Sequence, residues 1–190
     1  MKKIIPFLLV IISFAHCFKA DAYDYYGRKK YHLAVQVTNP LSLGSKGGGF
    51  LEYRNHQVSE VVGYTKYWDA YAGTQYSYQI MKFFRSRRKP HEYFLYFKGV
   101  MGDALYSSKK LAMFGDASDI LIGPVTYFGG GLGVGRRYNY NTFFFSWNLG
   151  AKYCTIVDDL SADDKRLFRL FYAAGPGSML EFNLRFGIQF

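Results

Sequence analysis

Apolar and polar residues alternate strictly through the last ten residues of the chain. From Glu181 to Phe190 every even position is apolar and every odd position is polar or glycine. A strand with this period has one apolar face and one polar face. A last strand of this kind, ending on an aromatic residue, is typical of a membrane barrel that closes by pairing its last strand with its first. The pattern therefore predicts a barrel strand over residues 181–190.

Seven further segments have the same period. They cover residues 31–43, 49–55, 57–66, 71–84, 92–106, 124–137 and 143–153, with a turn expected at Gly47–Gly49. Pro40 removes a ladder donor from the first segment, so we expect a bend or an early end there. In the third, Glu60 has the parity of Val58, which leaves the register weakly defined. With the terminal strand the count is eight, and the sequence predicts an all-β, eight-stranded antiparallel up-and-down transmembrane β-barrel.

The end of the chain resembles the C-terminal signature of bacterial outer-membrane β-barrel proteins. The matching positions are Phe182, Leu184, Phe186, Ile188 and Phe190. Two internal stretches, Asn39-Pro40-Leu41-Ser42-Leu43 and the segment 131–138 (Gly-Leu-Gly-Val-Gly-Arg-Arg-Tyr), resemble uncharacterised small members of the same group. The resemblance implies a place in the bacterial outer membrane. It also implies the barrel assembly machinery, which reads the terminal signature, and outer-membrane lipids as partners.

The N-terminus has the organisation of a secretory signal peptide. Lys2 and Lys3 precede an apolar block over residues 4–15, and Ala20-Asp21-Ala22 forms a small-x-small cleavage site. A transmembrane anchor is the first alternative, but the block is shorter than the ~20 residues that a spanning helix needs. A lipoprotein is the second, because Cys17 follows the apolar block, although His16 stands where a small residue is required. We predict a cleaved signal peptide over 1–22 and one barrel domain over 23–190.

Composition and charge agree with a membrane barrel. The chain contains 18 Tyr, 18 Phe and 20 Gly, and barrels place aromatic residues in interfacial girdles. The net charge of +10 falls to +8 when Lys2, Lys3, Lys19 and Asp21 leave with the signal. For an exported chain, anionic lipid head groups are the expected counter-ions, and we expect no nucleic-acid partner. Cys154 is the one cysteine left after cleavage, so the predicted mature chain forms no internal disulfide.

Connection lengths predict the orientation of the barrel. Short connections at 55–57, 85–91 and 138–141 alternate with longer ones at 43–49, 66–71, 107–123 and 155–178. Such barrels keep short turns in the periplasm, so both termini are predicted to be periplasmic. In the longest loop, Asp158, Asp159, Asp163 and Asp164 lack the spacing of a calcium loop and predict a solvated face. The apolar run behind them either packs over the barrel mouth or contacts an extracellular partner within residues 158–179.

The polar parity of the strands places charged residues in the lumen. The predicted inward set is Glu52, Arg54, Lys98, Arg137, Lys152, Glu181 and Arg185. A buried charge is costly unless it is paired, so we expect a network of ion pairs that plugs the lumen. A narrow pore that conducts ions is the alternative.

No catalytic constellation emerges from the sequence, and we predict neither an enzyme nor a metal or cofactor. His56, Ser59 and Glu60 invite comparison with lipid A deacylase barrels, but the H-x-S-N spacing is absent and alternation separates His56 from Ser59. The glycine-rich segment at 129–135 lacks the spacing of a phosphate-binding loop. The basic cluster at Arg85, Arg87, Arg88 and Lys89 either contacts lipid head groups or is solvated. A structural or surface-interaction role is predicted, with a lipid-modifying enzyme, a narrow pore and a soluble secreted β-barrel or sandwich as alternatives.

Overall fold

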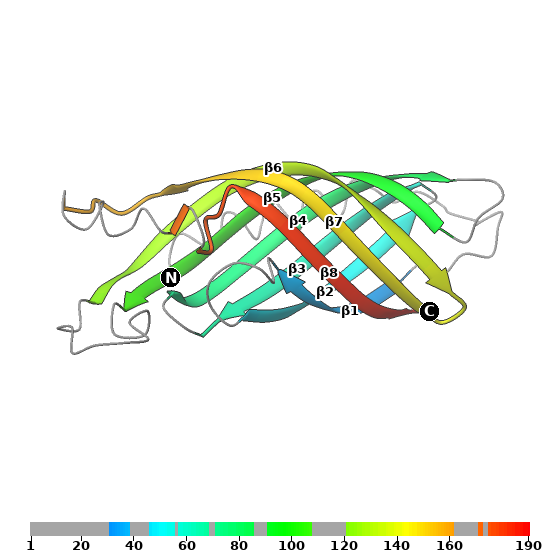
Figure 1. Cartoon of the computed structure of the whole chain (residues 1–190), viewed down its shortest axis with the longest axis horizontal. Coiled ribbons are helices and arrows are strands. Elements are labelled where there is room, and N and C mark those ends of the chain that lie inside the picture. The colour runs from blue at the N-terminus through cyan, green and yellow to red at the C-terminus, as the bar shows by residue number, and fades with distance from the viewer. Residues whose placement is uncertain are drawn as a thin grey trace.

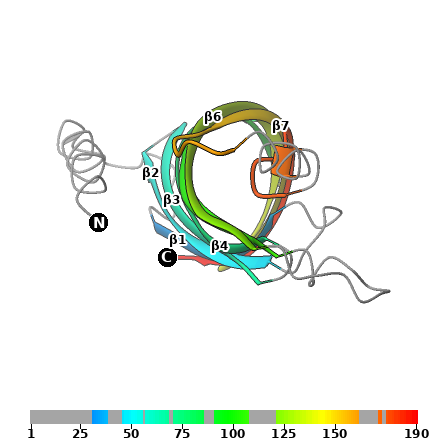
Figure 2. The same ribbon diagram turned by 90° about the vertical axis from the view of Figure 1, so that its left-hand side faces the viewer.

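Eight strands form a closed antiparallel barrel in this computed structural model (Figures 1 and 2). The structure describes residues 31–38, 46–55, 57–68, 71–85, 91–107, 121–161, 171–172 and 175–190. The strands are β1 (Tyr31–Thr38), β2 (Lys46–Asn55), β3 (Val58–Tyr67), β4 (Tyr71–Arg85), β5 (His91–Ser107), β6 (Leu121–Tyr140), β7 (Phe143–Ile156) and β8 (Leu180–Gln189). Each strand pairs with its neighbours in sequence, and β1 pairs with β8. The predicted fold class and strand count are confirmed.

The strand boundaries depart from the prediction at the start of β2. Gly47–Gly49 was predicted as a turn, but these residues belong to β2, where Gly49 pairs with Val35 and Gly48 with Thr65. The strands approach closely there, because a Cβ on Gly48 would lie 1.9 Å from the carbonyl oxygen of Tyr64. Glycine thus serves close packing at this position. The predicted strand segment at 39–43 lies outside the described residues.

The chain closes its barrel with its last residue. Tyr31 N donates to Phe190 O at 3.1 Å, and Phe190 N donates to Tyr31 O at 2.9 Å. Phe186 and Ile188 of β8 and the following Phe190 are exposed, whereas the polar residues of β8 are buried: Glu181, Asn183, Arg185 and Gln189. The alternation in the sequence therefore divides β8 into an outer apolar face and an inner polar face.

Both ends of the barrel chain, Tyr31 and Phe190, lie at the same end of the barrel. The strand ends that flank 56–57, 86–90 and 141–142 lie at this end, and Figure 1 shows the C-terminus beside the β6–β7 turn. Asn141 in that turn has a φ of 47°, a left-handed conformation that asparagine tolerates. The strand ends that flank 39–45, 68–70, 108–120 and 157–179 lie at the opposite end. We call these the terminus end and the loop end.

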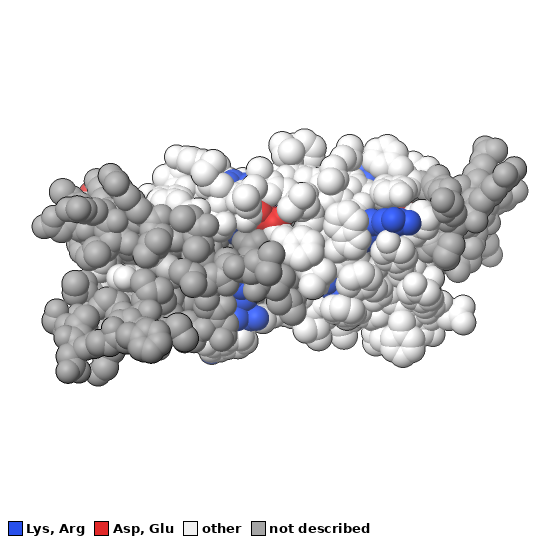
Figure 3. All heavy atoms as spheres, viewed as in Figure 1, with Lys and Arg blue, Asp and Glu red and all other residues white. Residues whose placement is uncertain are grey.

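The outer surface is an apolar belt. Its exposed side chains include Leu33, Leu51, Val62, Leu95, Phe97, Leu132, Val134 and Leu149, with many exposed aromatic residues around them. Figure 3 shows one side of this surface, where Lys, Arg, Asp and Glu are sparse. In the described strands the charged residues with outward parity are Glu60, Lys66, Lys82, Asp103 and Arg136. Among the described residues, no helix is long and apolar enough to cross a membrane.

Inward-facing glycines make room for large aromatic residues in the lumen. A Cβ on Gly133 would lie 2.7 Å from a ring carbon of Tyr96, and one on Gly150 would lie 2.2 Å from the Tyr96 hydroxyl. Gly133 and Gly150 are register partners on β6 and β7. The glycine-rich segment at 129–135 is thus a barrel strand, and its small residues accommodate aromatic residues from β5.

Candidate functional site

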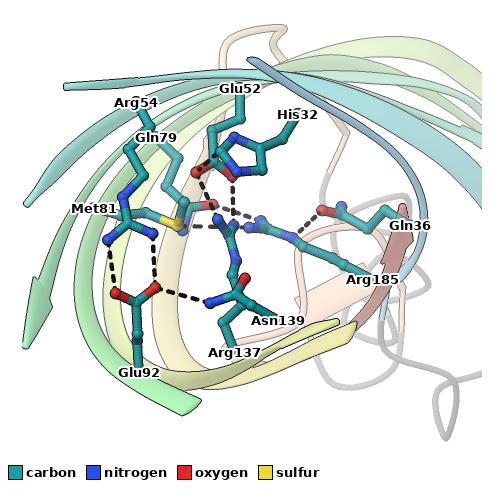
Figure 4. Close-up of polar contacts among 10 residues, drawn as sticks. All are labelled: His32, Gln36, Glu52, Arg54, Gln79, Met81, Glu92, Arg137, Asn139 and Arg185. Carbon is teal, nitrogen blue, oxygen red and sulfur yellow. Dashed lines mark hydrogen bonds and ion pairs between the residues drawn. The ribbon is translucent and has the colours of Figure 1, made fainter. Parts of the chain in front are cut away.

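The lumen gathers buried charges into two clusters. We call the first the lower cluster, near the terminus end, and its centre is the pair Arg137 and Glu52 (Figure 4). Arg137 Nη1 donates to Glu52 Oε1 at 2.8 Å, and Nη2 donates to Oε2 at 2.5 Å. Neither side chain is exposed. His32 lies beside the same carboxylate, with its Nδ1 3.7 Å from Oε1. Paired in this way, the two charges satisfy each other inside a narrow lumen.

A second bidentate pair completes the ionic part of the lower cluster. Arg54 donates to both oxygens of Glu92, at 2.7 and 2.9 Å. Asn139 Nδ2 donates to the same carboxylate at 3.1 Å. Glu92 comes from β5 and Arg54 from β2, so the pair joins strands that are not neighbours in the barrel.

Arg185 is held by neutral acceptors. Its Nε donates to Gln36 Oε1 at 2.8 Å and its Nη2 to Gln79 Oε1 at 2.7 Å. Its Nη1 lies 3.7 Å from the sulfur of Met81. Figure 4 shows these side chains converging on the guanidinium from different strands. Amide oxygens thus take the place of water around this buried cation.

Aromatic rings line the lower cluster and face its guanidinium groups. Arg54 lies 4.0 Å from the ring centroid of Phe83, and Arg185 lies 4.6 Å from that of Phe50. Arg137 lies 4.8 Å from the centroid of Phe83 and 4.6 Å from that of Phe144. Each ring stabilises a cation through its face while filling space with apolar volume. The lumen here is occupied by side chains.

The upper cluster lies closer to the loop end. Lys98 and Glu181 form a buried ion pair. Lys152 Nζ donates to the carbonyl oxygen of Pro176 at 2.7 Å and lies 3.5 Å from Gln75 Oε1. Asn183 Nδ2 donates to Asn148 Oδ1 at 2.7 Å. Lys152 thus binds a backbone carbonyl of the β7–β8 connection, which reaches into the barrel at this level.

Phe171, from the same connection, packs inside the barrel at the loop end. Its ring is fully buried and lies 5.0 Å from the ring of Tyr127 and 6.1 Å from that of Tyr71. Residues 175–178 are also buried, and Ser178 Oγ donates to Leu180 O at 3.0 Å. We call residues 171–172 and 175–178 the mouth segment. The apolar run at 166–172 was expected either to pack over the barrel mouth or to contact a partner. Phe171 packs in the mouth, and residues 166–170 lie outside the described part.

All seven charged residues predicted for the lumen are buried there. The structure pairs Glu52 with Arg137 and Glu181 with Lys98, but Arg54 pairs with Glu92, a residue outside the predicted inward set. Glu92 has the same parity as Lys98 on β5, so extending the inward series by three alternate positions would have found it. Gln36 and Gln79, which accept hydrogen bonds from Arg185, could not be predicted in the same way, because neutral polar residues occur at inward positions of several strands.

The other candidate residues are separated or not described. Ser59 is fully buried on the inner side of β3, whereas Glu60 is half-buried on the outer side. His56, Asp163, Asp164, Arg87, Arg88 and Lys89 lie outside the described residues, as does the side chain of Arg85. Asp158 is exposed, and its Oδ2 accepts from Thr126 N. Within the described residues, no group of three or more His, Cys, Asp or Glu side chains could hold a metal ion.

The residues of the terminal signature lie on the outer face of β8. Phe186, Ile188 and Phe190 are exposed, and Phe182 and Leu184 are half-buried. The ring of Phe186 lies 4.8 Å from that of Phe145, and the ring of Phe190 lies 6.2 Å from that of Tyr31. The signature thus also forms part of the aromatic belt at the seam of the barrel.

This fold is that of the small eight-stranded outer-membrane β-barrels. One solved structure with this fold is the N-terminal β-barrel domain of Pseudomonas aeruginosa OprF, with a TM-score of 0.58 and 13% identity over 86% of this chain and 98% of that one. Another is Neisserial surface protein A (NspA), with a TM-score of 0.50 and 14% identity over 86% of this chain and 99% of that one. No family model and no curated protein matches the sequence. At these identities the likeness establishes the fold.

Proposed function

We propose that the mature chain is an integral protein of the bacterial outer membrane with a structural or surface-interaction role and a lumen closed by its own side chains. The observation that carries this proposal is the inverted distribution of polarity. Apolar side chains such as Phe97 (70% exposed) and Leu132 (58% exposed) cover the outside, whereas the charged residues of the two clusters are buried inside. A lipid environment favours this distribution and water opposes it. The soluble secreted alternative requires the opposite arrangement.

The closed lumen is supported by both clusters and by the mouth segment. Three ion pairs cross the interior, and aromatic rings occupy the space between the cations. Phe171 and Lys152 hold the mouth segment above them. A conducting pore would need water in place of these contacts, so a steady open channel is not expected.

The connection lengths support an orientation of the barrel in the membrane. Short turns of such barrels face the periplasm, so we assign the terminus end to the periplasm and the loop end to the exterior. The N-terminal residues 1–22 would act as the cleaved signal peptide. The outward apolar residues of β8 would then be available to the barrel assembly machinery at the periplasmic side.

A surface-interaction role would use the loop end. Val157 and Met179, at the two ends of the β7–β8 connection, are 47% and 57% exposed. Asp158 and Asp159 give the exposed part of this connection an acidic character. An extracellular partner at residues 158–179 would therefore meet the exposed acidic start of the connection. An enzymatic role has less support, because Ser59 and Glu60 face opposite sides of the wall.

Heat-modifiable migration tests membrane-barrel formation. The purified chain, refolded in detergent, should migrate differently in gels before and after boiling, because a closed barrel resists unfolding by the detergent. Its insertion into a planar bilayer should give no steady conductance. Identical migration before and after boiling would contradict the barrel in detergent, and a steady open channel would contradict the closed lumen.

A further inference from the structure

Arg136 is a cation on the apolar outer surface of the barrel. Its neighbour Arg137 faces the lumen and pairs with Glu52, so alternation along β6 directs Arg136 outward. On the same face, Val134 lies two residues toward the loop end and Tyr138 two residues toward the terminus end. Val134 is 50% exposed, and so belongs to the apolar belt. Arg136 therefore marks the boundary between aliphatic and aromatic residues on this strand.

Two tyrosines flank the Arg136 guanidinium. Its central carbon lies 4.7 Å from the ring centroid of Tyr138 and 5.2 Å from that of Tyr93. Tyr93 is the register partner of Arg136 on β5. The ring of His91 lies 5.5 Å from that of Tyr93 and 6.0 Å from that of Tyr138, which supports both rings from the side of the terminus end. These contacts orient the guanidinium without neutralising its charge.

The anionic partner of Arg136 is absent from the described part of the protein. No described carboxylate lies within 4.0 Å of the guanidinium, and its buried Nε has no hydrogen-bond partner among the described atoms. The buried cations of the lumen, by contrast, all have protein acceptors. A guanidinium in an apolar belt requires an anionic or strongly polar ligand.

We propose that Arg136, between Tyr93 and Tyr138, binds the phosphodiester of a glycerophospholipid in the leaflet at the terminus end. The proposal rests on the membrane insertion proposed above. Guanidinium groups bind phosphate through two parallel hydrogen bonds, and tyrosines are enriched at head-group level. Leu95 and Val134, register partners that are 48% and 50% exposed, continue from the site toward the loop end. They provide an apolar surface for the acyl chains, which a free phosphate would not use.

Retention of lipid by the folded protein tests this site. The full chain is refolded in a non-ionic detergent, incubated with dioleoylphosphatidylglycerol or with dioleoylglycerol, and analysed by native mass spectrometry. The parent should retain the phospholipid in preference to dioleoylglycerol, which has the same acyl chains and no phosphate. Arg136→Gln should lower phospholipid retention by about tenfold, the loss expected for a charge-assisted contact. Arg136→Lys, which keeps the charge but not the fork, should retain an intermediate amount.

Lys82→Gln is the matched control. Lys82 also has outward parity, is exposed, and is the register partner of Leu95 on the other side of β5. Its substitution removes one positive charge from the same belt, so retention should change by less than about twofold. Equal losses in the two variants would indicate a general charge effect and overturn the site. Millimolar inorganic phosphate should not displace the lipid, and displacement would assign the site to free phosphate instead.

Heat-modifiable migration of each variant separates failure of the site from failure of the fold. If Arg136→Gln does not give the folded band, Tyr138→Leu keeps the guanidinium, removes its nearer ring and should still lower retention. A folded Arg136→Gln protein that retains phospholipid as the parent does would overturn the site while leaving the membrane barrel intact. A parent chain with no heat-modifiable band would overturn the proposed function itself.

Discussion

Arg137 and Glu52 join opposite walls of the barrel. Arg137 lies on β6 and Glu52 on β2, strands that are diametrically opposed in the ring of eight, and two hydrogen bonds of 2.8 and 2.5 Å connect them. Backbone ladders connect only neighbouring strands. The pairs Arg54 with Glu92 and Lys98 with Glu181 also join non-neighbouring strands. The buried ion pairs therefore connect parts of the barrel wall that no backbone hydrogen bond connects. They fix the cross-section of the barrel.

Removing one partner of the opposed pair should destabilise the barrel strongly. Glu52→Gln leaves the Arg137 guanidinium buried without a carboxylate, which typically costs about 3–5 kcal/mol. The double variant Glu52→Gln with Arg137→Met should recover part of that loss, since no uncompensated charge remains. Urea unfolding of the refolded protein in detergent measures both free energies. Asp159→Asn, a substitution at an exposed carboxylate, is the control and should change the stability little. A Glu52→Gln protein as stable as this control would contradict the structural role of the pair.

Close packing around Tyr96 predicts a difference between two glycines. A Cβ on Gly133 would lie 2.3 Å from the carbonyl oxygen of Leu149, whereas one on Gly99 would have no heavy atom within 4 Å. Gly133→Ala should therefore destabilise the barrel by about 1–3 kcal/mol through overpacking. Gly99→Ala adds the same methyl group in open space on the outer face and should be nearly neutral. Thermal or urea unfolding of the two variants compares them directly, and equal stabilities would show that the strands separate without cost.

The terminal strand predicts a specific assembly defect. Replacing Phe186 and Phe190 by Asp removes the terminal signature and places charges on the lipid-facing side of the strand, where they are unfavourable. We expect export without assembly, measured as protein in the periplasm but not in the outer-membrane fraction. Tyr140→Asp with Phe143→Asp is the matched control, because these residues are 61% and 64% exposed at the same end of the barrel. An equal defect in the control would show that charges in the apolar belt, and not the loss of the terminal signature, block assembly. Normal outer-membrane levels of the Phe186 and Phe190 variant would refute the prediction.

Phe171 predicts how firmly the mouth segment is held. Its ring packs against Tyr127 and Tyr71 with no exposed surface, so Phe171→Ala should remove about 3–5 kcal/mol of local packing. Without this packing the mouth segment should become sensitive to added protease, while the strands stay protected. Met179→Ala, at a position that is 57% exposed beside the same segment, is the control. Cleavage at the same rate in both variants would contradict the packing role of Phe171.

The strand pattern was predictable because one physical cause dominates it. Lipid outside and a polar lumen inside impose period two, and all eight strands followed from it. The rule assigns faces but no partners: among the consecutive residues Phe143, Phe144 and Phe145, parity places Phe144 inward, but it does not show that the ring lies against Arg137. The sequence of a single strand does not predict which aromatic residue will stack on a cation across the lumen. That choice depends on the register between strands.

The pairing within the lumen was less predictable for the same reason. Parity alone assigned Glu52 and Arg54 to the interior, but both are on β2 and face different partners, Arg137 and Glu92. The barrel stagger determines which residues of opposite walls meet, and the sequence of one strand does not contain it. The glycines at 47–49 were mistaken for a turn because glycine favours turns and also allows strands to approach closely.

Glu181 distinguishes a closed lumen from a conducting one. It is fully buried and paired with Lys98, and Lys152 interacts with it electrostatically from the neighbouring strand. In a closed lumen, Glu181→Gln leaves two cations with less compensation, so the barrel should lose about 3 kcal/mol or more of stability and still conduct no steady current. In a water-filled pore, solvent would already satisfy Lys98 and Lys152, so the same variant would alter ion selectivity with little change in stability. Urea unfolding and planar-bilayer conductance of the parent, Glu181→Gln and the exposed control Asp159→Asn separate the two cases. A steady anion-selective current with unchanged unfolding would show that the lumen is a pore.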